Sequence, residues 1–317
     1  MLISPQDTIR YLSAHDNTYI RYFRGHSAPV TTLSLSPGSD EFISASLDNT
    51  VKLWDLRSTN PSHTLNITGP YLATYDPGAV VLAIACPATQ IVMLYDARQV
   101  DADPFATFKV GPYVSQFTQG RAGATERHTL GDWTKLEFSV DSKKLLIATS
   151  GPGHFVIDAY DGPLIAYLPK TNGTTNRISP ALRSRVAPLT PATPAQAPRN
   201  AGVTGTGDAC FSPDSRFVLG GSGEAGMLVW DLNIADAARA GGDSNGNGNG
   251  IKQEDTTMSG TSGSKLFDVK EKVLLPSHVI GEERKDAGMA SVVGYNPRHN
   301  LVAMADRQVV FWVPDLE

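Results

Sequence analysis

A Trp-Asp dipeptide and its degenerate copies recur along the chain, and this repeat constrains the fold more than any other feature. The copies are Leu12-Ser13, Trp54-Asp55, Tyr95-Asp96, Ile157-Asp158, Trp230-Asp231 and Trp312-Val313. Successive copies lie 42, 41, 62, 73 and 82 residues apart. A period of roughly 20 to 50 residues indicates a fold of stacked, similar units. The chain is therefore predicted to be a repeat protein whose later units carry insertions.

Each unit contains short runs rich in β-branched and aromatic residues. In the best-preserved unit, residues 25–69, these runs are "PVTTLSLSP", "DEFISAS", "NTVKLWDL" and "SHTLNI". The first run has four further copies, "PYLATYDP", "DWTKLEFSVD", "TGDACFSPD" and "MASVVGYNP". Such runs between turn signals predict antiparallel strands. One four-stranded sheet cannot bury both of its faces, so we predict an all-β fold in which successive sheets stack radially around a channel.

Three segments account for the excess length of the later units, and they are residues 111–131, 171–205 and 236–265. The second is rich in proline and the third in Gly, Ser and Asn. Segments of this kind cannot bury enough apolar area to offset the entropy lost on ordering. All three are predicted to be flexible insertions in a single domain that spans residues 1–317.

The composition excludes several classes of protein. A net charge of −5 with 41% apolar residues describes a globular protein without the basic excess that DNA binding requires. Cys86 and Cys210 each lie in an apolar run, which favours buried thiols over a disulfide. No stretch approaches the ~18 apolar residues of a membrane span, and residues 1–16 lack the layout of a signal peptide. We therefore expect a soluble, intracellular protein without direct DNA or membrane binding.

A buried hydrogen-bonded chain is predicted in the best-preserved unit. His26 precedes the first strand, Ser44 and Ser46 lie in the second, Asp48 follows it, and Trp54 lies in the third. Either serine can bond to the histidine, so both remain candidates. A His, Ser and Asp set also fits nucleophilic catalysis. Its spacing repeats with the unit, however, which favours a structural role.

Two later units keep parts of this set. An acidic residue stands six positions before the tryptophan in each, Glu224 before Trp230 and Asp306 before Trp312. His278 is expected to be the partner of the last set. The same hydrogen-bonded chain is therefore predicted to recur, incompletely, along the protein.

These repeats resemble the WD40-repeat β-propeller family over the whole chain apart from the insertions. A closer resemblance rests on "QDTIRYLSAHDNTYIRYFRGH", "FISASLDNTVKLWDLRS", "DPFATFKV", "DWTKLEFSVDSKKLLIATS" and the terminal "FWVPDLE". These segments are similar to the WD40 subunit shared by the COMPASS histone H3 methyltransferase complex and the machinery of transcription termination and RNA 3′-end processing. The resemblance implies a nuclear, non-catalytic scaffold without a cofactor. The partners that it implies are histone methyltransferase subunits, termination and phosphatase-targeting factors, and the phosphorylated tail of RNA polymerase II.

The chain departs at its start from the seven-bladed ring of that family. Residues 8–13 align with residues 50–55, with only seven residues ahead of them. We count four full blades plus two partial ones of a seven-bladed parent. The propeller is therefore expected to be N-terminally incomplete, or to close differently. We expect an open arc; the alternative is that "NTYIRYF" docks on "QVVFWVP" and closes a five-bladed ring.

Tyr71 and Trp133 begin the first strands of two units, close to the predicted channel mouth, and are candidate contacts for protein partners. Large aromatic side chains give much contact area for little loss of rotamer entropy. The alternative is that both pack between blades. A generic peptide-binding adaptor outside the complexes named above is the alternative function.

Three further hypotheses concern chemistry. An enzyme is not expected, because the seven histidines lack metal-ligand spacing and no nucleophile elbow or phosphate-binding loop occurs. Weak RNA contact by the second insertion is an alternative to a solvated loop, on account of Arg177, Arg183, Arg185 and Arg199. "IKQE", residues 251–254, has the aliphatic-Lys-x-Glu pattern that SUMO-conjugating enzymes accept. Lys252 is therefore a candidate modification site, against the alternative of an ordinary linker.

Overall fold

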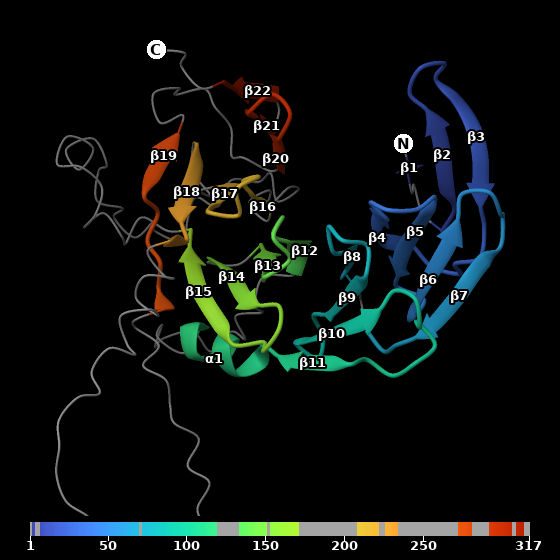
Figure 1. The fold of residues 1–317 in the computed structure, drawn as a ribbon, viewed down its shortest axis with the longest axis horizontal. Coiled ribbons are helices and arrows are strands. Elements are labelled where there is room, and N and C mark those ends of the chain that lie inside the picture. The colour runs from blue at the N-terminus through green and yellow to red at the C-terminus, as the bar shows by residue number, and fades with distance from the viewer. Residues whose placement is uncertain are drawn as a thin grey trace, which may run out of the picture.

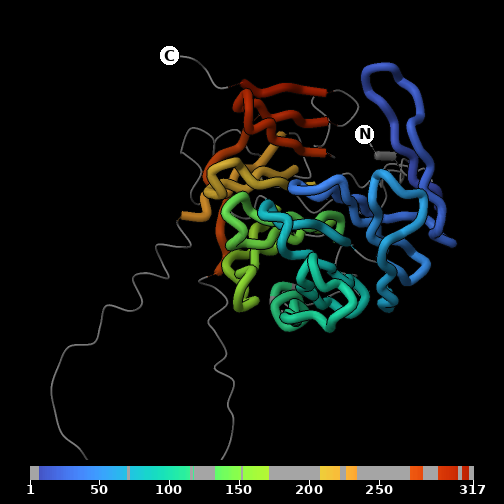
Figure 2. Tube along the Cα trace, turned by 45° about the vertical axis from the view of Figure 1, so that its right-hand side comes forward, coloured from blue at the N-terminus to red at the C-terminus, as the bar shows by residue number. Residues whose placement is uncertain are grey.

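The protein consists of antiparallel β-sheets that follow one another along an arc (Figures 1 and 2). The computed structural model describes residues 2–3, 7–69, 72–118, 133–150, 153–170, 208–221, 226–233, 272–280, 292–305 and 309–313. Within these residues there are six sheets, here called the first to the sixth in chain order. The predicted all-β architecture of successive antiparallel sheets is confirmed. No described helix is long and apolar enough to cross a bilayer.

Four of the sheets have four strands each. The second sheet contains β4 (Val30–Leu35), β5 (Glu41–Ser46), β6 (Thr50–Asp55) and β7 (Pro61–Asn66). The third contains β8 (Leu72–Tyr75), β9 (Val81–Cys86), β10 (Ile91–Asp96) and β11 (Ala106–Lys109). The fourth contains β12 (Trp133–Phe138), β13 (Lys144–Thr149), β14 (Gly153–Asp158) and β15 (Leu164–Pro169). The fifth contains β16 (Ala209–Phe211), β17 (Phe217–Gly221), β18 (Met227–Asp231) and β19 (His278–Ile280).

The two end sheets have three strands each among the described residues. The first contains β1 (Leu2–Ile3), β2 (Ile9–Ser13) and β3 (Thr18–Phe23). The sixth contains β20 (Val292–Asn296), β21 (Leu301–Ala305) and β22 (Val309–Trp312). In the described part of the chain β3 pairs with β2 alone and β22 with β21 alone. The strand "NTYIRYF" therefore does not pair with "QVVFWVP" there.

The first strands of neighbouring sheets lie side by side and are joined by hydrogen bonds. The amides of Ala73 and Tyr75 donate to Thr32 Oγ1 at 3.2 Å and Ser34 Oγ at 3.4 Å. Both bonds span 41 residues, so β4 and β8 run in the same direction. At the far end of the arc, the amide of Val293 donates to Asp208 Oδ2 at 3.0 Å. Side chains of the inner strands thus link one sheet to the next.

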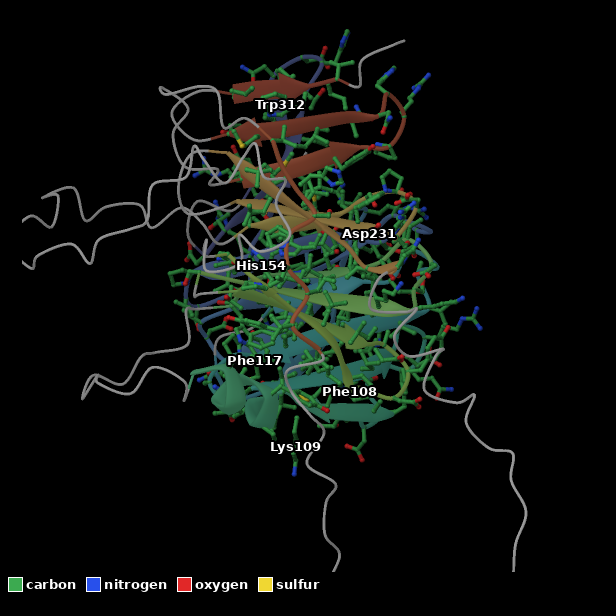
Figure 3. The ribbon with its side chains drawn as sticks, turned by 90° about the vertical axis from the view of Figure 1, so that its left-hand side faces the viewer. Phe108, Lys109, Phe117, His154, Asp231 and Trp312 are labelled. Carbon is green, nitrogen blue, oxygen red and sulfur yellow. The ribbon has the colours of Figure 1, made fainter. Side chains whose placement is uncertain are left out.

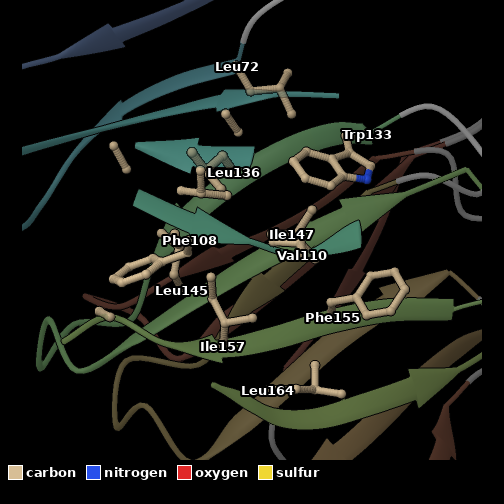
Figure 4. Packing of buried hydrophobic residues seen from close by; sticks show 14 of the residues in the cluster. Leu72, Phe108, Val110, Trp133, Leu136, Leu145, Ile147, Phe155, Ile157 and Leu164 are labelled. Atoms are coloured by element: carbon tan, nitrogen blue, oxygen red, sulfur yellow. The ribbon is translucent and has the colours of Figure 1, made fainter. Parts of the chain in front are cut away.

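The hydrophobic core lies between the sheets. Five clusters of buried side chains fill the five junctions between successive sheets. The largest lies between the third and fourth sheets, where Leu72, Phe108 and Val110 meet Trp133 and side chains of β13 and β14 (Figure 4). Each inner sheet buries both faces because a neighbour covers each of them. The amino-acid sequences of these strands are therefore nearly continuous runs of apolar residues.

Corresponding turns share one backbone conformation. Ala79, Ser142 and Ser215 all have φ between 56° and 58° and occupy the turns after the first strand of the third, fourth and fifth sheets. Asn49 and Gln90 have φ of 64° and 56° in the turns after the second strand. Non-glycine residues rarely adopt this left-handed region. Its recurrence at equivalent places shows that the repeat extends to the backbone.

The start of the predicted insertion 111–131 is ordered as helix α1 (Gly111–Thr118). Proline has no backbone N–H, and an N–H group in the first turn of a helix has no acceptor within that helix. Pro112 therefore costs no hydrogen bond at this position. Val114 is fully buried, and Phe117 stacks on Tyr167 with 4.2 Å between ring centroids. These eight residues differ from the flexible excursion that the sequence predicts, because apolar side chains at helical spacing pack on the fourth sheet.

Several predicted features lie outside the described residues. They are segments 119–131, 171–205 and 236–265, the four arginines of the second insertion, Tyr71, Glu224, Lys252 and Asp306.

Candidate functional site

His26 is the centre of a buried hydrogen-bonded chain in the second sheet. Its Nε2 atom lies 2.7 Å from Ser44 Oγ, and its Nδ1 atom lies 2.9 Å from Asp48 Oδ2. The indole N–H of Trp54 donates to Ser44 Oγ at 2.8 Å. Of the two serines that the sequence leaves open, Ser44 is the one that bonds to His26. β4 brings His26 here because it begins just after the histidine and pairs with β5, which carries Ser44.

Ser46 has a different function in the same turn. Its Oγ atom lies 2.9 Å from the carbonyl oxygen of Ala28 and 3.0 Å from that of Pro29. The amide of Asp48 donates to Ser46 Oγ at 3.2 Å. Ser46 therefore ties the β5–β6 turn to the segment before β4, next to the His26 chain.

The carboxylate of Asp48 is the last member of the hydrogen-bonded chain around His26. Thr50 Oγ1 donates to Asp48 Oδ1 at 2.6 Å, and the amide of Ser27 donates to Oδ2 at 2.9 Å. Burial opposes ionisation, but hydrogen bonds from Thr50, Ser27 and His26 outweigh it and lower the pKa of Asp48 to about 2. Burial also lowers the pKa of His26, against the attraction of Asp48. His26 is thus neutral at neutral pH, with Nδ1–H donating to Asp48 and Nε2 accepting the Ser44 hydroxyl.

The His26 chain is closed to substrates. Ser44 is fully buried, and His26 is 6% exposed. A nucleophile must reach its substrate, and the Ser44 hydroxyl is already held between His26 and Trp54. This geometry supports a structural role rather than catalysis. No group of three or more His, Cys, Asp or Glu residues in the described ranges could hold a metal ion.

The fifth sheet keeps the tryptophan of this chain but lacks its serine. Trp230 pairs with Val218 as Trp54 pairs with Phe42, which places Gly220 at the position of Ser44. A Cβ on Gly220 would lie 3.2 Å from an atom of the Trp230 ring. The indole N–H of Trp230 is buried and has no hydrogen-bond partner in the described part of the chain.

A histidine from the fourth sheet packs on this tryptophan. The ring of His154, on β14, stands at 86° to that of Trp230 with 5.9 Å between centroids. The amide of Thr149 donates to His154 Nδ1 at 3.1 Å, so Nε2 carries the proton. Burial, with the nearby charge of Lys170, holds the pKa of His154 well below its usual range. His154 Nε2–H, like the indole N–H, is buried and finds no acceptor within the described ranges.

Lys170 lies beside this pair. Its Nζ atom donates to the carbonyl oxygen of Thr149, and the residue is 4% exposed. Burial lowers the pKa of Lys170 to about 7. No sequence motif marks His154 or Lys170, because they come from the fourth sheet while the tryptophan that they approach belongs to the repeat of the fifth.

The last predicted set does not assemble around His278. This histidine lies on β19, exposed, with Nδ1 3.0 Å from Ser277 Oγ. The indole N–H of Trp312 has no hydrogen-bond partner among the residues that the structure describes, which do not include Asp306. The expected pairing is wrong because β19 pairs with β18 as the outer strand of the fifth sheet, whereas His26 directly precedes the inner strand β4.

Trp133 is a core residue and not a surface contact. It is 6% exposed and belongs to the cluster between the third and fourth sheets (Figure 4). The alternative of packing between blades therefore holds for Trp133, since both adjoining sheets cover its ring.

A charged cluster that the sequence does not single out lies on the inner strands. Lys135 Nζ is 2.9 Å from Glu137 Oε2 and 3.4 Å from Asp208 Oδ1, and it donates to the carbonyl oxygen of Ala209 at 3.1 Å. Burial opposes the charge on Lys135, but the two carboxylates prevail and raise its pKa to about 12. The alternating charges of "TKLEF" indicate the Lys135–Glu137 pair on β12. Asp208 is 73 residues further along the chain, so no local pattern connects it with this pair. This cluster joins the fourth sheet to the fifth.

The chain is 32% identical over 315 residues to WD repeat-containing protein 82 of Drosophila melanogaster, and the match covers 98% of this chain and 71% of that protein. The chain belongs to the WD40-repeat family. The family model "WD domain, G-beta repeat" matches residues 17–55. These residues run from β3 to β6 and contain the whole His26 chain, so the best-preserved WD40 unit is also the one with the complete hydrogen-bonded set.

Two other WD40-repeat relatives carry names that point to one complex. The chain is 29% identical over 313 residues to "Set1 complex component swd2" of Schizosaccharomyces pombe, covering 96% of this chain and 74% of that protein. It is 27% identical over 307 residues to "COMPASS component SWD2" of Saccharomyces cerevisiae, covering 97% of this chain and 71% of that protein. The resemblance to a WD40 component of the COMPASS complex, inferred from the sequence segments, is confirmed.

The fold has a solved counterpart. A chain in the crystal structure of the mitotic checkpoint complex superimposes with a TM-score of 0.56 at 13% identity, over 99% of this chain and 73% of that one. At this identity the likeness concerns the β-propeller fold alone.

Proposed function

We propose that this WD40-repeat protein is a non-catalytic scaffold subunit of a COMPASS-like histone H3 lysine methyltransferase complex and that it works in the nucleus. The observation that carries the proposal is similarity along the whole chain to two proteins named as components of that complex. Each of those matches covers at least 96% of this chain. Similarity of this extent includes every sheet, so it concerns the protein's surfaces as well as its repeat.

The structure supports a scaffold in two ways. The His, Ser and Asp set of the second sheet, the complete one among the described residues, is buried and fully hydrogen-bonded, which suits a structural role in the sheet. Successive sheets are joined by core clusters and by hydrogen bonds between inner strands. A rigid body of this kind can hold partners in a set geometry without changing shape.

The resemblance also implies a second setting, in transcription termination and mRNA 3′-end processing. There the partners would be termination and phosphatase-targeting factors and the phosphorylated tail of RNA polymerase II. These partners remain predictions of the family resemblance.

The two end sheets expose large apolar side chains, and these can be explained by the seven-bladed ring that the family resemblance implies. Val292, Val309 and Phe311 on one face of the sixth sheet are 56%, 61% and 60% exposed. On the first sheet, Tyr19 and Tyr22 are 48% and 42% exposed. A seven-bladed ring accounts for both observations, because a further sheet between the two ends would cover these side chains. We therefore include in the proposal that the six described sheets form part of a seven-bladed ring.

Affinity purification from nuclear extract followed by mass spectrometry tests the function. The expected result is recovery of methyltransferase-complex subunits with the tagged protein. Recovery of 3′-end processing subunits alone would support the second setting. A well-folded bait that retrieves neither set would overturn the proposed function and leave the WD40 fold intact.

A further inference from the structure

Turns alternate between two faces of the propeller because the inner strands run in the same direction. The Leu35 face, as we define it, comprises the β4–β5, β6–β7, β8–β9, β10–β11, β12–β13 and β14–β15 turns of the second, third and fourth sheets. The His26 face comprises the turns at the other ends of the same strands. Asp231, at the end of β18, and His154, near the start of β14, lie toward these two opposite sides in Figure 3.

Exposed apolar side chains gather on the Leu35 face. Leu35, Val80 and Val140 adjoin the first turn of three successive sheets and are 54%, 42% and 56% exposed. Phe105 and Tyr160 lie in the last turns of the third and fourth sheets and are 61% and 69% exposed. Among the described turns of the His26 face in these sheets, the exposed large apolar residue is Leu47. Single exposed apolar residues are ordinary, but their concentration on one face is not.

The turns that carry these residues touch one another. A Cβ on Gly38, in the β4–β5 turn, would lie 3.1 Å from the Cβ of Ala79, the neighbour of Val80. Gly162, two residues after Tyr160, is in contact with Phe108 on β11, the strand that Phe105 precedes. The turns of Leu35 and Val80 therefore adjoin, and the turn of Val140 follows because β8 and β12 lie side by side. Leu35, Val80 and Val140 thus lie on successive turns that one extended ligand can span.

This surface is acidic. Its turns contain five exposed acidic residues, Asp40, Asp101, Asp103, Asp141 and Asp161; a sixth, Asp76, is buried and accepts hydrogen bonds from backbone amides of its own turn. The basic residues of the same turns are Arg57, Arg98 and Lys143. One basic residue is already used, because Arg57 pairs with Asp40 at 2.8 Å. The described turns of the His26 face carry one acidic residue, Asp48, and two basic ones, Arg24 and Lys170, so an acidic excess is found on the Leu35 face and not on the described part of the His26 face.

We propose that the Leu35 face binds an extended segment of a partner protein in which basic and apolar side chains alternate. The apolar side chains would cover Leu35, Val80 and Val140, and the basic ones would meet the exposed turn carboxylates. The existence of a partner rests on the proposed scaffold function; the chemistry of the segment rests on this face alone.

The charge of the Leu35 face favours a basic peptide segment over nucleic acid, an anionic membrane or a second copy of this protein. Nucleic acids and anionic membranes are repelled by a surface on which five exposed acidic residues face three basic ones. A symmetric dimer through the Leu35 face would bring two acidic surfaces together. A basic, apolar segment satisfies both the charges and the exposed side chains.

Binding of synthetic peptides to the full chain tests the proposal. The first peptide alternates lysine and leucine; the second has glutamate for lysine, and the third has serine for leucine, all of equal length. At physiological ionic strength we expect the first to bind most tightly. The triple variant Leu35→Ser, Val80→Ser, Val140→Ser should weaken its binding about tenfold, whereas Leu47→Ser, on the His26 face, should leave it unchanged.

Hydrogen exchange and thermal unfolding complete the experiment. Bound peptide should protect amides of residues 36–40, 76–80 and 139–143, and both variants should unfold like the wild type. Equal binding of the three peptides, no binding, an equal loss with Leu47→Ser, or protection on the His26 face would each overturn the proposal. The nuclear purification with wild-type bait judges the proposed function separately, whichever result the peptides give.

Discussion

His154 and Trp230 come from neighbouring sheets, yet their rings meet edge to face with 5.9 Å between centroids. Both side chains are fully buried, and no described residue accepts a hydrogen bond from His154 Nε2 or Trp230 Nε1. In the second sheet, Ser44 Oγ is the atom shared by His26 and Trp54. The junction of the fourth and fifth sheets therefore brings a histidine and a tryptophan ring together without a hydroxyl group between them.

Serine at position 220 is expected to supply that acceptor. A Cβ there would lie 3.2 Å from His154 Nε2 and from the Trp230 ring, so the neighbours must shift slightly. Alanine causes the same crowding without the hydroxyl and is the matched control. We expect Gly220→Ser to exceed Gly220→Ala in free energy of unfolding by about 1 kcal/mol, the usual net value of a hydrogen bond. Equal stabilities in urea denaturation would contradict this expectation.

Removing the imidazole of His26 should destabilise the protein. His26→Ala leaves Ser44 and Asp48 without a buried partner, which typically costs about 1 to 3 kcal/mol in free energy of unfolding. His63 is the control, because its side chain is 43% exposed and lies 3.6 Å from exposed Asp101. His63→Ala should change stability by less than about 0.5 kcal/mol. Chemical denaturation of both variants gives the comparison, and similar losses would refute a special role for the chain.

The stability of the protein should rise with pH above neutrality because of Lys170. Burial lowers the folded-state pKa of Lys170 to about 7, from an ordinary value of 10.5. Between these values the unfolded state binds more protons than the folded state, so the free energy of unfolding increases with pH. Lys170→Met should flatten this increase, whereas the exposed Lys143→Met should preserve it. Urea midpoints measured from pH 7 to pH 10 test the sign, and a profile unchanged by Lys170→Met would count against it.

The uncovered face of the sixth sheet should promote self-association of the isolated protein. Val309 and Phe311 are 61% and 60% exposed on β22, a strand whose outer edge has no partner among the described strands. Apolar faces and open edges of this kind favour association. Phe311→Ser should therefore lower the sedimentation coefficient at high protein concentration, whereas Leu47→Ser should not. A wild-type protein that is monodisperse at all concentrations would be evidence against the prediction.

Lys252, outside the described residues, remains a predicted site of SUMO conjugation. It lies in "IKQE" within a Gly- and Asn-rich segment, where an extended lysine can reach a conjugating enzyme. Lys252→Arg should remove one conjugate from the purified protein in a conjugation reaction, and Lys143→Arg is the control. An unchanged pattern of conjugates would show that the motif is not used.

Some side chains could be assigned from the sequence and others were misread. His26, Asp48 and Trp54 meet because each keeps a set place in a local four-stranded unit. Trp133 was a candidate partner contact because aromatic residues often anchor interfaces. It is instead buried between two sheets. Whether a residue at the start of an inner strand faces solvent or the next sheet depends on the packing angle between blades, which no local pattern encodes.

The sequence by itself determined the repeat, the antiparallel sheets and the family, because strand patterning and turn chemistry act within about 40 residues of chain. Only the tertiary structure decided which side chains meet across the junctions between sheets. In the folded protein Ser44 and not Ser46 bonds to His26, His154 packs against Trp230, and helix α1 packs on the fourth sheet. The tertiary structure also gathers the exposed apolar residues on the Leu35 face. These outcomes depend on contacts between residues far apart in the chain, whose energies are settled only when neighbouring sheets dock.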